Sequence, residues 1–163
     1  MTEKKPIENY LQVLEESLHK KLAVLARIEE LNNDQGSILR QTTVSEEAFD
    51  RSIEDKGLLV EELNKLDEGF EVLYNHIKEQ LVQGKDKYKA QIAVLQTLIK
   101  EVMEKSVVIQ TQEARNKVLA EKFFADKKKE VQKGRKSSKV AMNYYRNMNQ
   151  SQIVSPQFMD KKN

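Results

Sequence analysis

The sequence has no cysteine and no tryptophan among its 163 residues. Disulfide bonds and thiolate metal sites are therefore excluded, which suits a reducing compartment. The sequence also has no run of about 18 apolar residues, the length that a membrane-spanning helix needs. Its first residues, MTEKKPIENY, lack the apolar core of a secretory signal. These absences predict a cytoplasmic protein that is not inserted into a membrane.

Residues that interrupt helices are also scarce. The chain has two prolines and five glycines, its aromatic content is 6%, and 33% of its residues are charged. This composition favours long helices with charged outer faces over a globule, and the length is that of one domain. The sequence therefore predicts an extended helical assembly.

Charge is distributed unevenly along the chain. Residues 121–163 carry 11 Lys and Arg against 4 Asp and Glu, whereas residues 1–120 carry 17 against 22. The basic part is suited to an acidic partner surface, a phosphate backbone or a membrane face. The two parts are thus expected to meet different surroundings.

The first predicted helix covers about residues 6–32. Pro6 suits its first turn, where a backbone N–H has no partner. Asn32, Asn33 and Gly36 predict the end of this helix and a loop. Its apolar residues recur every three or four positions, as on one face of a helix: Ile7, Leu11, Leu14, Leu18, Leu22, Leu25 and Ile28.

The second predicted helix covers about residues 45–82. Thr43 or Ser45 can cap its first amides, and Glu46 and Glu47 favour the positive end of the helix dipole. Its apolar stripe steps by fours and threes, as in a coiled-coil seam: Leu59, Leu63, Leu66, Phe70, Leu73, Ile77 and Leu81.

The third predicted helix covers about residues 87–133. Gly84 with Asp86 predicts a short turn that makes the second and third helices antiparallel neighbours. The alternative is one continuous helix through the glycine. The seam of the third helix is polar at Ser106, Glu113 and Asn116. Polar residues there either fix the register or face another helix less tightly.

Together these segments predict an all-α fold, an elongated antiparallel three-helix bundle of coiled-coil type formed by residues 1–133. A fold-back at Gly84 pairs residues at equal distances from the turn, so the second helix begins beside Phe124. The second helix is about 57 Å long and the third about 70 Å, so that about nine residues of the third extend beyond it. Whether the first helix packs on this hairpin or on a second copy, and the oligomeric state, stay open.

Residues 134–163 are predicted to be a partner-binding tail, helical or partly disordered. Val140, Tyr144 and Met148 recur at four-residue steps, which predicts a short amphipathic helix once it has a surface to lie on. Nine residues are too few for a stable helix alone in water. Pro156 breaks any helix near the end, which is either an extended docking peptide or an untethered tail.

The candidate partner-binding residues are apolar and lie at or beyond the end of the predicted bundle. They are Leu119, Phe123, Phe124, Val140, Met142, Tyr144, Tyr145, Met148, Ile153, Val154, Phe158 and Met159. The other elements have too little apolar surface left to cover them. An apolar surplus beyond a core predicts contact with another protein.

Patterns typical of catalysis are missing from the sequence. One Glu-x-x-His pair occurs, Glu16 with His19, but a di-iron bundle needs two such pairs and further inward carboxylates. We interpret this pair as a solvated helix flank. Phosphate-binding glycine loops, nucleophile elbows and Cys/His clusters do not occur. The sequence therefore predicts no catalytic, cofactor-binding or metal-binding residues, no small-molecule substrate and no enzymatic activity.

The basic run at residues 127–139, KKKEVQKGRKSSK, is a candidate nucleic-acid contact. It has the charge to bind phosphates but no interleaved aromatics and no recognisable nucleic-acid-binding motif. We interpret it as a solvated or hinge segment, and nucleic-acid binding stays a lesser alternative.

Two stretches resemble a known family. Residues 66–81, LDEGFEVLYNHIKEQL, and the ending NYYRNM…VSPQFMDKKN are similar to the FlgN-type flagellar export chaperones of Gram-positive bacteria. The resemblance implies a small cytoplasmic helical protein that holds hook-associated, hook-filament junction proteins unassembled and delivers them to the type III export gate. It also implies that Val140, Met142, Tyr144, Tyr145 and Met148 contact the substrate, with Tyr144 or Tyr145 docking at the gate.

From these patterns we expect the tail and the far part of the third helix to bind an amphipathic helix of an export substrate. Two other classes stay open. One is a coiled-coil adaptor that associates with itself through its seam, and the other is a nucleic-acid-binding protein that uses the basic run.

Overall fold

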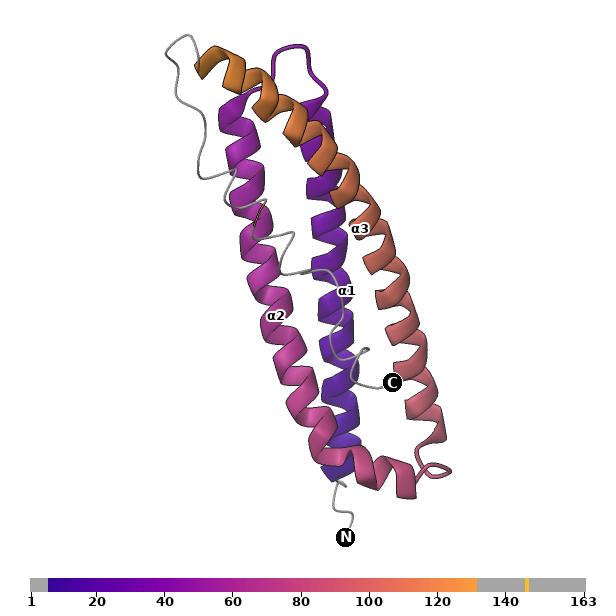
Figure 1. The fold of residues 1–163 in the computed structure, drawn as a ribbon. Coiled ribbons are helices and arrows are strands. Elements are labelled where there is room, and N and C mark those ends of the chain that lie inside the picture. Colours follow the sequence, from indigo (N-terminus) through magenta and orange to yellow (C-terminus); the bar gives the residue numbers. More distant parts are fainter. Residues whose placement is uncertain (1–5, 132–145, 147–163) are drawn as a thin grey trace.

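The computed structural model describes residues 6–131 and Arg146. The described residues form α1 (Pro6–Leu39), α2 (Glu46–Gln83) and α3 (Lys89–Val131), with no strand among them. The chain runs up along α1, down along α2 and up again along α3 (Figure 1). The predicted all-α three-helix bundle is confirmed. The last two residues predicted for the third helix, and the tail apart from Arg146, lie outside the described residues.

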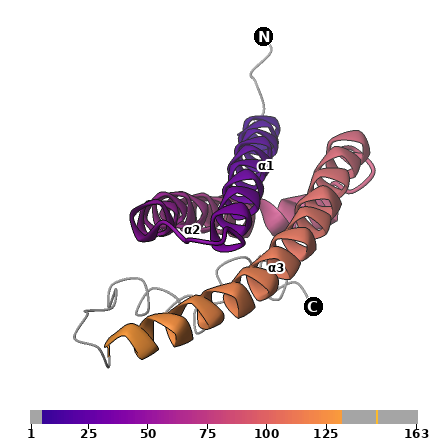
Figure 2. The ribbon, with the colours of Figure 1, turned by 90° about the horizontal axis from the view of Figure 1, so that it is seen from above.

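The helix α1 is the centre of the bundle. Both α2 and α3 pack along it, whereas the backbones of α2 and α3 approach each other at hardly any point. Seen from above, α3 crosses the α1–α2 pair at an angle (Figure 2). The predicted antiparallel course of the second and third helices is confirmed, but they are not close backbone neighbours as expected, because both pack along α1. The first helix packs on the other two, a question that the sequence left open.

The predicted end of the first helix near Asn32 is wrong. Helix α1 continues to Leu39, and Asn32 and Gln35 inside it are fully buried. Their side chains bond groups on the other two helices, so these polar residues are held by tertiary contacts and do not end the helix. Gly36 lies where an added Cβ would be 3.1 Å from Asn116 Oδ1, which shows how closely α1 and α3 approach.

Both ends of α2 agree with local sequence signals. Ser45 is the N-cap and its hydroxyl accepts a hydrogen bond from the Ala48 amide. At the other end, the Gly84 amide donates to Gln80 O at 2.8 Å and the Tyr88 amide donates to Gly84 O at 3.0 Å. The turn at Gly84 is confirmed, and the continuous-helix alternative is wrong.

The main apolar core lies between the three helices over most of their length. Burying one such Leu or Phe side chain completely contributes about 1.5–3 kcal/mol. Its buried members include Leu11, Leu14, Leu18, Leu25, Ile28, Leu63, Phe70, Ile77, Leu95, Val102 and Ile109.

A second, smaller apolar cluster closes the other end of the bundle. Phe49 at the start of α2 is fully buried there, beside Leu39 of α1. Its ring centroid lies 5.6 Å from that of Phe123 and 5.9 Å from that of Phe124. The predicted pairing of the start of α2 with Phe124 is thus confirmed, and α3 continues beyond this contact to Val131.

None of the helices in the described part of the chain combines the length and the hydropathy needed to cross a membrane.

Candidate functional site

Three of the predicted partner-binding residues lie in the described part of the chain. Phe123 is buried in the second apolar cluster, and Leu119 and Phe124 pack against it, half-buried. Their apolar surface is thus largely used within the bundle, and contact with a partner stays a prediction for them. The other nine lie outside the described residues: Val140, Met142, Tyr144, Tyr145, Met148, Ile153, Val154, Phe158 and Met159.

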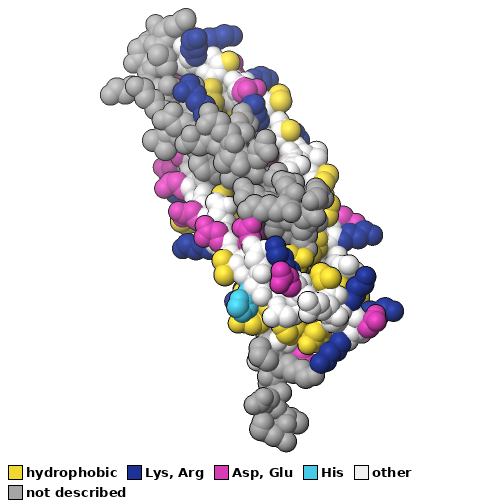
Figure 3. All heavy atoms as spheres, turned by 60° about the horizontal axis from the view of Figure 1, so that its bottom comes forward, with side chains coloured by type: hydrophobic (Ala, Val, Ile, Leu, Met, Phe, Trp, Pro, Cys, Tyr) yellow, Lys and Arg dark blue, Asp and Glu magenta, His cyan; other side chains and the backbone are white. Residues whose placement is uncertain are grey.

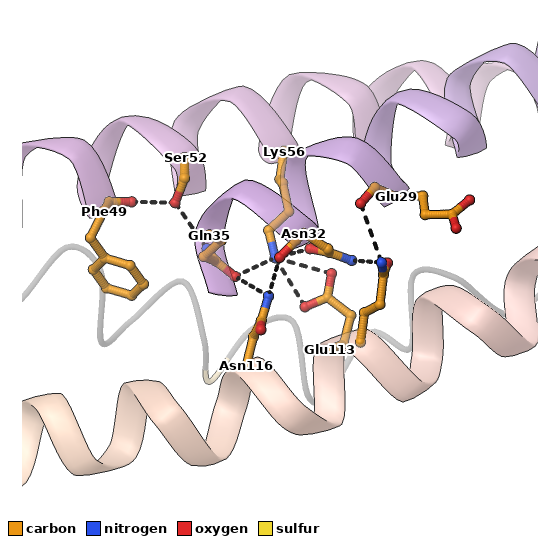
Figure 4. A network of polar contacts seen from close by, with 9 residues as sticks. Glu29, Asn32, Gln35, Phe49, Ser52, Lys56, Glu113 and Asn116 are labelled. Carbon is orange, nitrogen blue, oxygen red and sulfur yellow. Dashed lines mark hydrogen bonds and ion pairs between the residues drawn. The ribbon is translucent and has the colours of Figure 1, made fainter. Parts of the chain in front are cut away.

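A layer of buried polar side chains separates the two apolar clusters (Figure 4). Its centre is Lys56 of α2, whose side chain is 0% exposed. The Lys56 ammonium donates to Asn32 Oδ1 at 2.9 Å and to Gln35 Oε1 at 3.1 Å, both on α1. It also lies 3.0 Å from each carboxylate oxygen of Glu113 on α3. One ammonium group thus bonds both other helices.

Amide side chains extend this layer on both sides. Asn116 Nδ2 donates to the Asn32 carbonyl at 2.9 Å and to Gln35 Oε1 at 3.1 Å. Gln112 Nε2 donates to Asn33 Oδ1 at 3.0 Å, and Gln35 Nε2 donates to the Ser52 hydroxyl at 2.9 Å. Buried amides need such partners, because an unpaired one costs free energy.

The environment of Lys56 changes its pKa. Burial removes water from the ammonium group and lowers the pKa of Lys56 from its ordinary value of 10.5, and the Glu113 carboxylate opposes that change. An ammonium group has three protons to donate, and the oxygens of Asn32, Gln35 and Glu113 accept from it. This arrangement suits a structural role in aligning the three helices, since the group is both bonded and buried.

The polar layer combines residues that the sequence singled out with residues that it did not. Glu113 and Asn116 stood out as polar positions on the third seam, and both lie in the layer. Lys56 was missed, although it lies seven residues from both Phe49 and Leu63, which are buried at the same seam position. That seven-residue spacing could have placed Lys56 on the buried seam. The fold-back at Gly84 could have placed Glu113 opposite Lys56.

The Glu16–His19 pair lies on the surface of α1. Both side chains are exposed, and His19 lies 3.7 Å from Glu15. Among the described residues, no three His, Asp or Glu side chains are placed to hold a metal ion. Beside His19, a shallow, open depression of about 270 Å³ is lined by Ala93, Val94, Thr97 and Leu98 of α3. No titratable group besides the histidine lines it.

The middle of α3 has both polar and apolar residues on its inner side, where Ile109 belongs to the main core. Ser106, Gln112 and Asn116 are buried on its inner side. Val107 and Val118 on its outer side are 61% and 64% exposed. An amphipathic helix in a bundle normally has fewer polar residues inside and fewer exposed valines outside. Exposed valines on such a helix are suited to contacts outside its own bundle.

We define the outer stripe of α3 as a row of uncharged residues at steps of three and four. They are Ile92, Gln96, Ile99, Met103, Val107, Gln110 and Ala114. Ile92 and Ile99 pack against the main core, whereas Met103 is 44% exposed. The row is about 33 Å long, at 1.5 Å per residue.

The orientation of the outer stripe follows from the bonds of α3. Gln112 and Asn116 bond α1 and lie on one side of Glu113, which bonds Lys56 of α2. With 3.6 residues per turn, the stripe lies on the other side of Glu113, away from α1. Since the backbones of α2 and α3 are apart, neither α1 nor α2 covers Val107.

Elsewhere, apolar and charged side chains are interspersed on the surface. One face shows hydrophobic side chains gathered toward the end of the bundle that holds the α2–α3 turn, with charged side chains around them (Figure 3). Leu58 and Val72 on α2 are exposed at 67% and 69%, but isolated apolar residues of this kind are normal on protein surfaces.

Only the start of the basic run lies in the described part of the chain. Lys127 is 3.7 Å from Glu130 and its ammonium lies 5.9 Å from the centre of the Phe123 ring. Lys128 and Lys129 are exposed in the last turn of α3, where positive charge is favourable to the helix dipole. These three lysines therefore have an adequate structural explanation.

Comparison with known proteins gave no relative. No protein-family model, no curated protein and no solved structure matches this chain. The resemblance to FlgN-type chaperones therefore stays a prediction.

Proposed function

We propose that this protein is a chaperone that binds an amphipathic helix of a partner protein and keeps that helix from assembling. The exposed valine and methionine side chains in the middle of α3 support the proposal most strongly. Val107 and Met103 face outward while Glu113 and Asn116 face inward, so the helix has an apolar face that its own bundle leaves uncovered. A partner helix can bury that face.

The binding mode that fits this surface is a helix laid along the outer stripe. A partner with apolar residues at steps of three and four would contact Val107 and Met103, and the tail residues 140–148 would complete the contact. Methionine adapts its shape to different partners, which suits a surface that receives helices of other proteins. Ordering the tail on binding costs free energy, so the affinity is expected to be moderate and the partner releasable.

The identity of the partner rests on the family resemblance alone. Similarity to FlgN-type chaperones implies that the bound helix belongs to a hook-filament junction protein. The complex would form in the cytoplasm, and Tyr144 or Tyr145 would contact the type III export gate.

The proposal can be tested with one substitution on the outer stripe and one matched control. Val107→Asp places a charge on the stripe, whereas Val72→Asp places it on α2 at a residue exposed to a similar extent, 69% against 61%. We expect Val107→Asp to weaken binding of hook-filament junction proteins by more than about tenfold, since burying an unpaired charge is costly. Isothermal titration calorimetry measures the affinity.

Two calorimetric results would contradict the proposal. One is equal affinity of the Val107→Asp and native proteins for every junction protein tested. The other is an equal loss of affinity in the Val72→Asp control, because the stripe would then have no special role.

The same stripe also fits a second copy of this chain, as a self-associating coiled-coil adaptor requires. Sedimentation at several concentrations separates the two functions. A chaperone stays a compact monomer without its partner, whereas an adaptor forms a dimer that Val107→Asp disrupts.

A further inference from the structure

The outer stripe of α3 is least covered around Val107. That side chain is 61% exposed, and Val108 beside it is 42% exposed. No helix in the described part of the chain packs over them, since the backbones of α2 and α3 approach each other at hardly any point. Covering Val107 with another apolar side chain would remove apolar surface from water, which is favourable.

The charge pattern limits what can cover it. Between Glu104 and Arg115, every exposed residue of α3 is uncharged: Val107, Val108, Gln110, Thr111 and Ala114. The exposed face of α2, by contrast, includes Glu61, Glu62, Lys65 and Glu68. The outer stripe is thus suited to a helix that is itself nearly uncharged.

This chain contains such a segment close to the end of α3. Residues 140–148, VAMNYYRNM, carry a single Lys, Arg, Asp or Glu, which is Arg146. Val140, Tyr144 and Met148 recur at four-residue steps, so a helix would place them on one face. These three side chains are uncharged, like those of the outer stripe.

The connection is long enough for the segment to reach the stripe. Residues 132–139 lie between Val131, where α3 ends, and Val140. Fully extended, these eight residues span about 26–29 Å, and the distance back along α3 from Val131 to Ala114 is about 26 Å. A nine-residue helix is about 14 Å long, so it would extend from near Ala114 to near Lys105.

We propose that residues 140–148 of this chain dock as a helix on the outer stripe of α3, antiparallel to α3, with Val140, Tyr144 and Met148 against Val107 and its neighbours. The segment is too short to be helical alone, so docking and helix formation occur together. The tether keeps the local concentration of the segment in the millimolar range, which lets a weak contact form.

Docking has a consequence that rests on the proposed function. A partner helix that uses the same stripe must first displace residues 140–148, or take them up into its own contact.

Site-specific labelling tests the docking without any partner. The chain has no cysteine, so the full-length Val107→Cys variant has one thiol, whose rate of reaction with a small maleimide reports its accessibility. Adding Val140→Ser, Tyr144→Ser and Met148→Ser removes the apolar face of the segment. We expect these changes to increase the labelling rate about tenfold. A tenfold change corresponds to about 1.4 kcal/mol of free energy that the docked segment contributes to protecting the thiol.

Two controls make the result specific. Ile153→Ser with Phe158→Ser removes apolar tail residues outside the segment and should leave the labelling of Val107→Cys unchanged. A Val72→Cys variant labels α2, and the three serine substitutions should not affect its rate. A synthetic peptide of residues 138–150, added in excess, should slow labelling of the triple-serine Val107→Cys protein again.

The outcomes separate this proposal from the proposed function. Equal labelling with the native and the triple-serine tail would overturn the docking, whatever the protein binds. Protection that grows with protein concentration would also overturn it, because a second copy would then cover the stripe. If the tail protects Val107→Cys from labelling but the protein binds no junction protein, the docking stands and the proposed function is contradicted.

Discussion

Two stretches of α3 use opposite chemistry on the same helix. From Ile92 to Val102 its inner seam is apolar and joins the main core. From Ser106 to Asn116 its inner residues include buried polar groups, and Val107 faces outward. The comparison shows that one helix can stabilise a bundle through apolar contacts along one stretch and align it through polar contacts along the next, where Val107 stays exposed.

The two stretches also differ in how strictly they define the helix register. Apolar contacts are non-directional, so a heptad-patterned seam retains much of its burial when it slips by one repeat. The Lys56 ammonium can reach Asn32 on α1 and Glu113 on α3 in one alignment of the three helices. The apolar core thus supplies most of the stability, and the polar layer selects the alignment.

The largest expected effect comes from breaking the polar layer on one side. Glu113→Ala leaves the ammonium of Lys56, which is 0% exposed, without its anionic partner. We expect the free energy of unfolding to fall by about 3–5 kcal/mol, the usual cost of half of a buried ion pair. Urea denaturation measures it, and Glu104→Ala, at an exposed position of α3, is the control.

Removing both charges sharpens that test. Lys56→Met with Glu113→Met should be far less destabilised than Glu113→Ala, because no buried charge is left unpaired. If the effects of the two single Met substitutions simply added up, the ion pair would not be coupled across the helices, contrary to the proposed alignment role.

A slightly smaller effect is expected in the apolar core. Leu25 of α1 is fully buried, whereas Leu58 of α2 is 67% exposed. Leu25→Ala should lower the free energy of unfolding by about 2–5 kcal/mol, since it removes buried apolar surface and leaves a cavity. Leu58→Ala should change it by less than about 0.5 kcal/mol. Similar losses for the two variants in thermal or urea unfolding would contradict the assigned core.

The polar layer also predicts a pH dependence. Burial lowers the pKa of Lys56 in the folded protein below its ordinary value of 10.5, which it keeps in the unfolded chain. At a pH between the folded and the unfolded pKa, the unfolded chain therefore binds more protons than the folded protein. The contribution of this group to the free energy of unfolding therefore rises with pH across that window. As the pH rises toward the ordinary pKa of 10.5, the native protein should gain stability relative to Lys56→Met. Parallel unfolding curves at all pH values would contradict the lowered pKa.

The smallest expected effect compares two glycines inside helices. A Cβ at Gly69 would meet nothing within 4 Å, whereas one at Gly36 would lie 3.1 Å from Asn116 Oδ1 and from the Arg40 guanidinium. Gly69→Ala should raise the free energy of unfolding by about 0.5–1 kcal/mol through helix propensity. Gly36→Ala should lower it, because the buried Asn116 would have to move. Melting temperatures that rise equally in both variants would show that α1 and α3 are not tightly packed at Gly36.

The parts of the fold that depend on neighbouring residues could be predicted from the sequence. The cap at Ser45 and the turn at Gly84 are short-range features, and they fixed both ends of α2. The fold-back at Gly84 then predicted that the second helix would begin beside Phe124, and Phe49 near the start of α2 lies there. The end of α1 was predicted wrongly, because Asn32 and Gly36 have the chemistry of a helix stop until partners from α2 and α3 are present.

The candidate site was less predictable than the fold. Periodicity identified Glu113 and Asn116 as polar seam residues, but it could not show that Lys56 lies between them and α1. The outward exposure of Val107 was also hidden, because valine at that position fits a core as well as a surface. Which face of a helix is covered depends on where the other helices lie.

The sequence by itself determined that this chain forms long amphipathic helices, where α2 begins, and where the chain turns into α3. Helix propensity, caps and apolar spacing act over a few residues, so they can be recognised without a structure. Only the tertiary structure decided that α1 is central, that Lys56 is enclosed by two other helices, and that Val107 in the middle of α3 is exposed. Burial and hydrogen bonding between distant segments decide these features, and no local pattern specifies them.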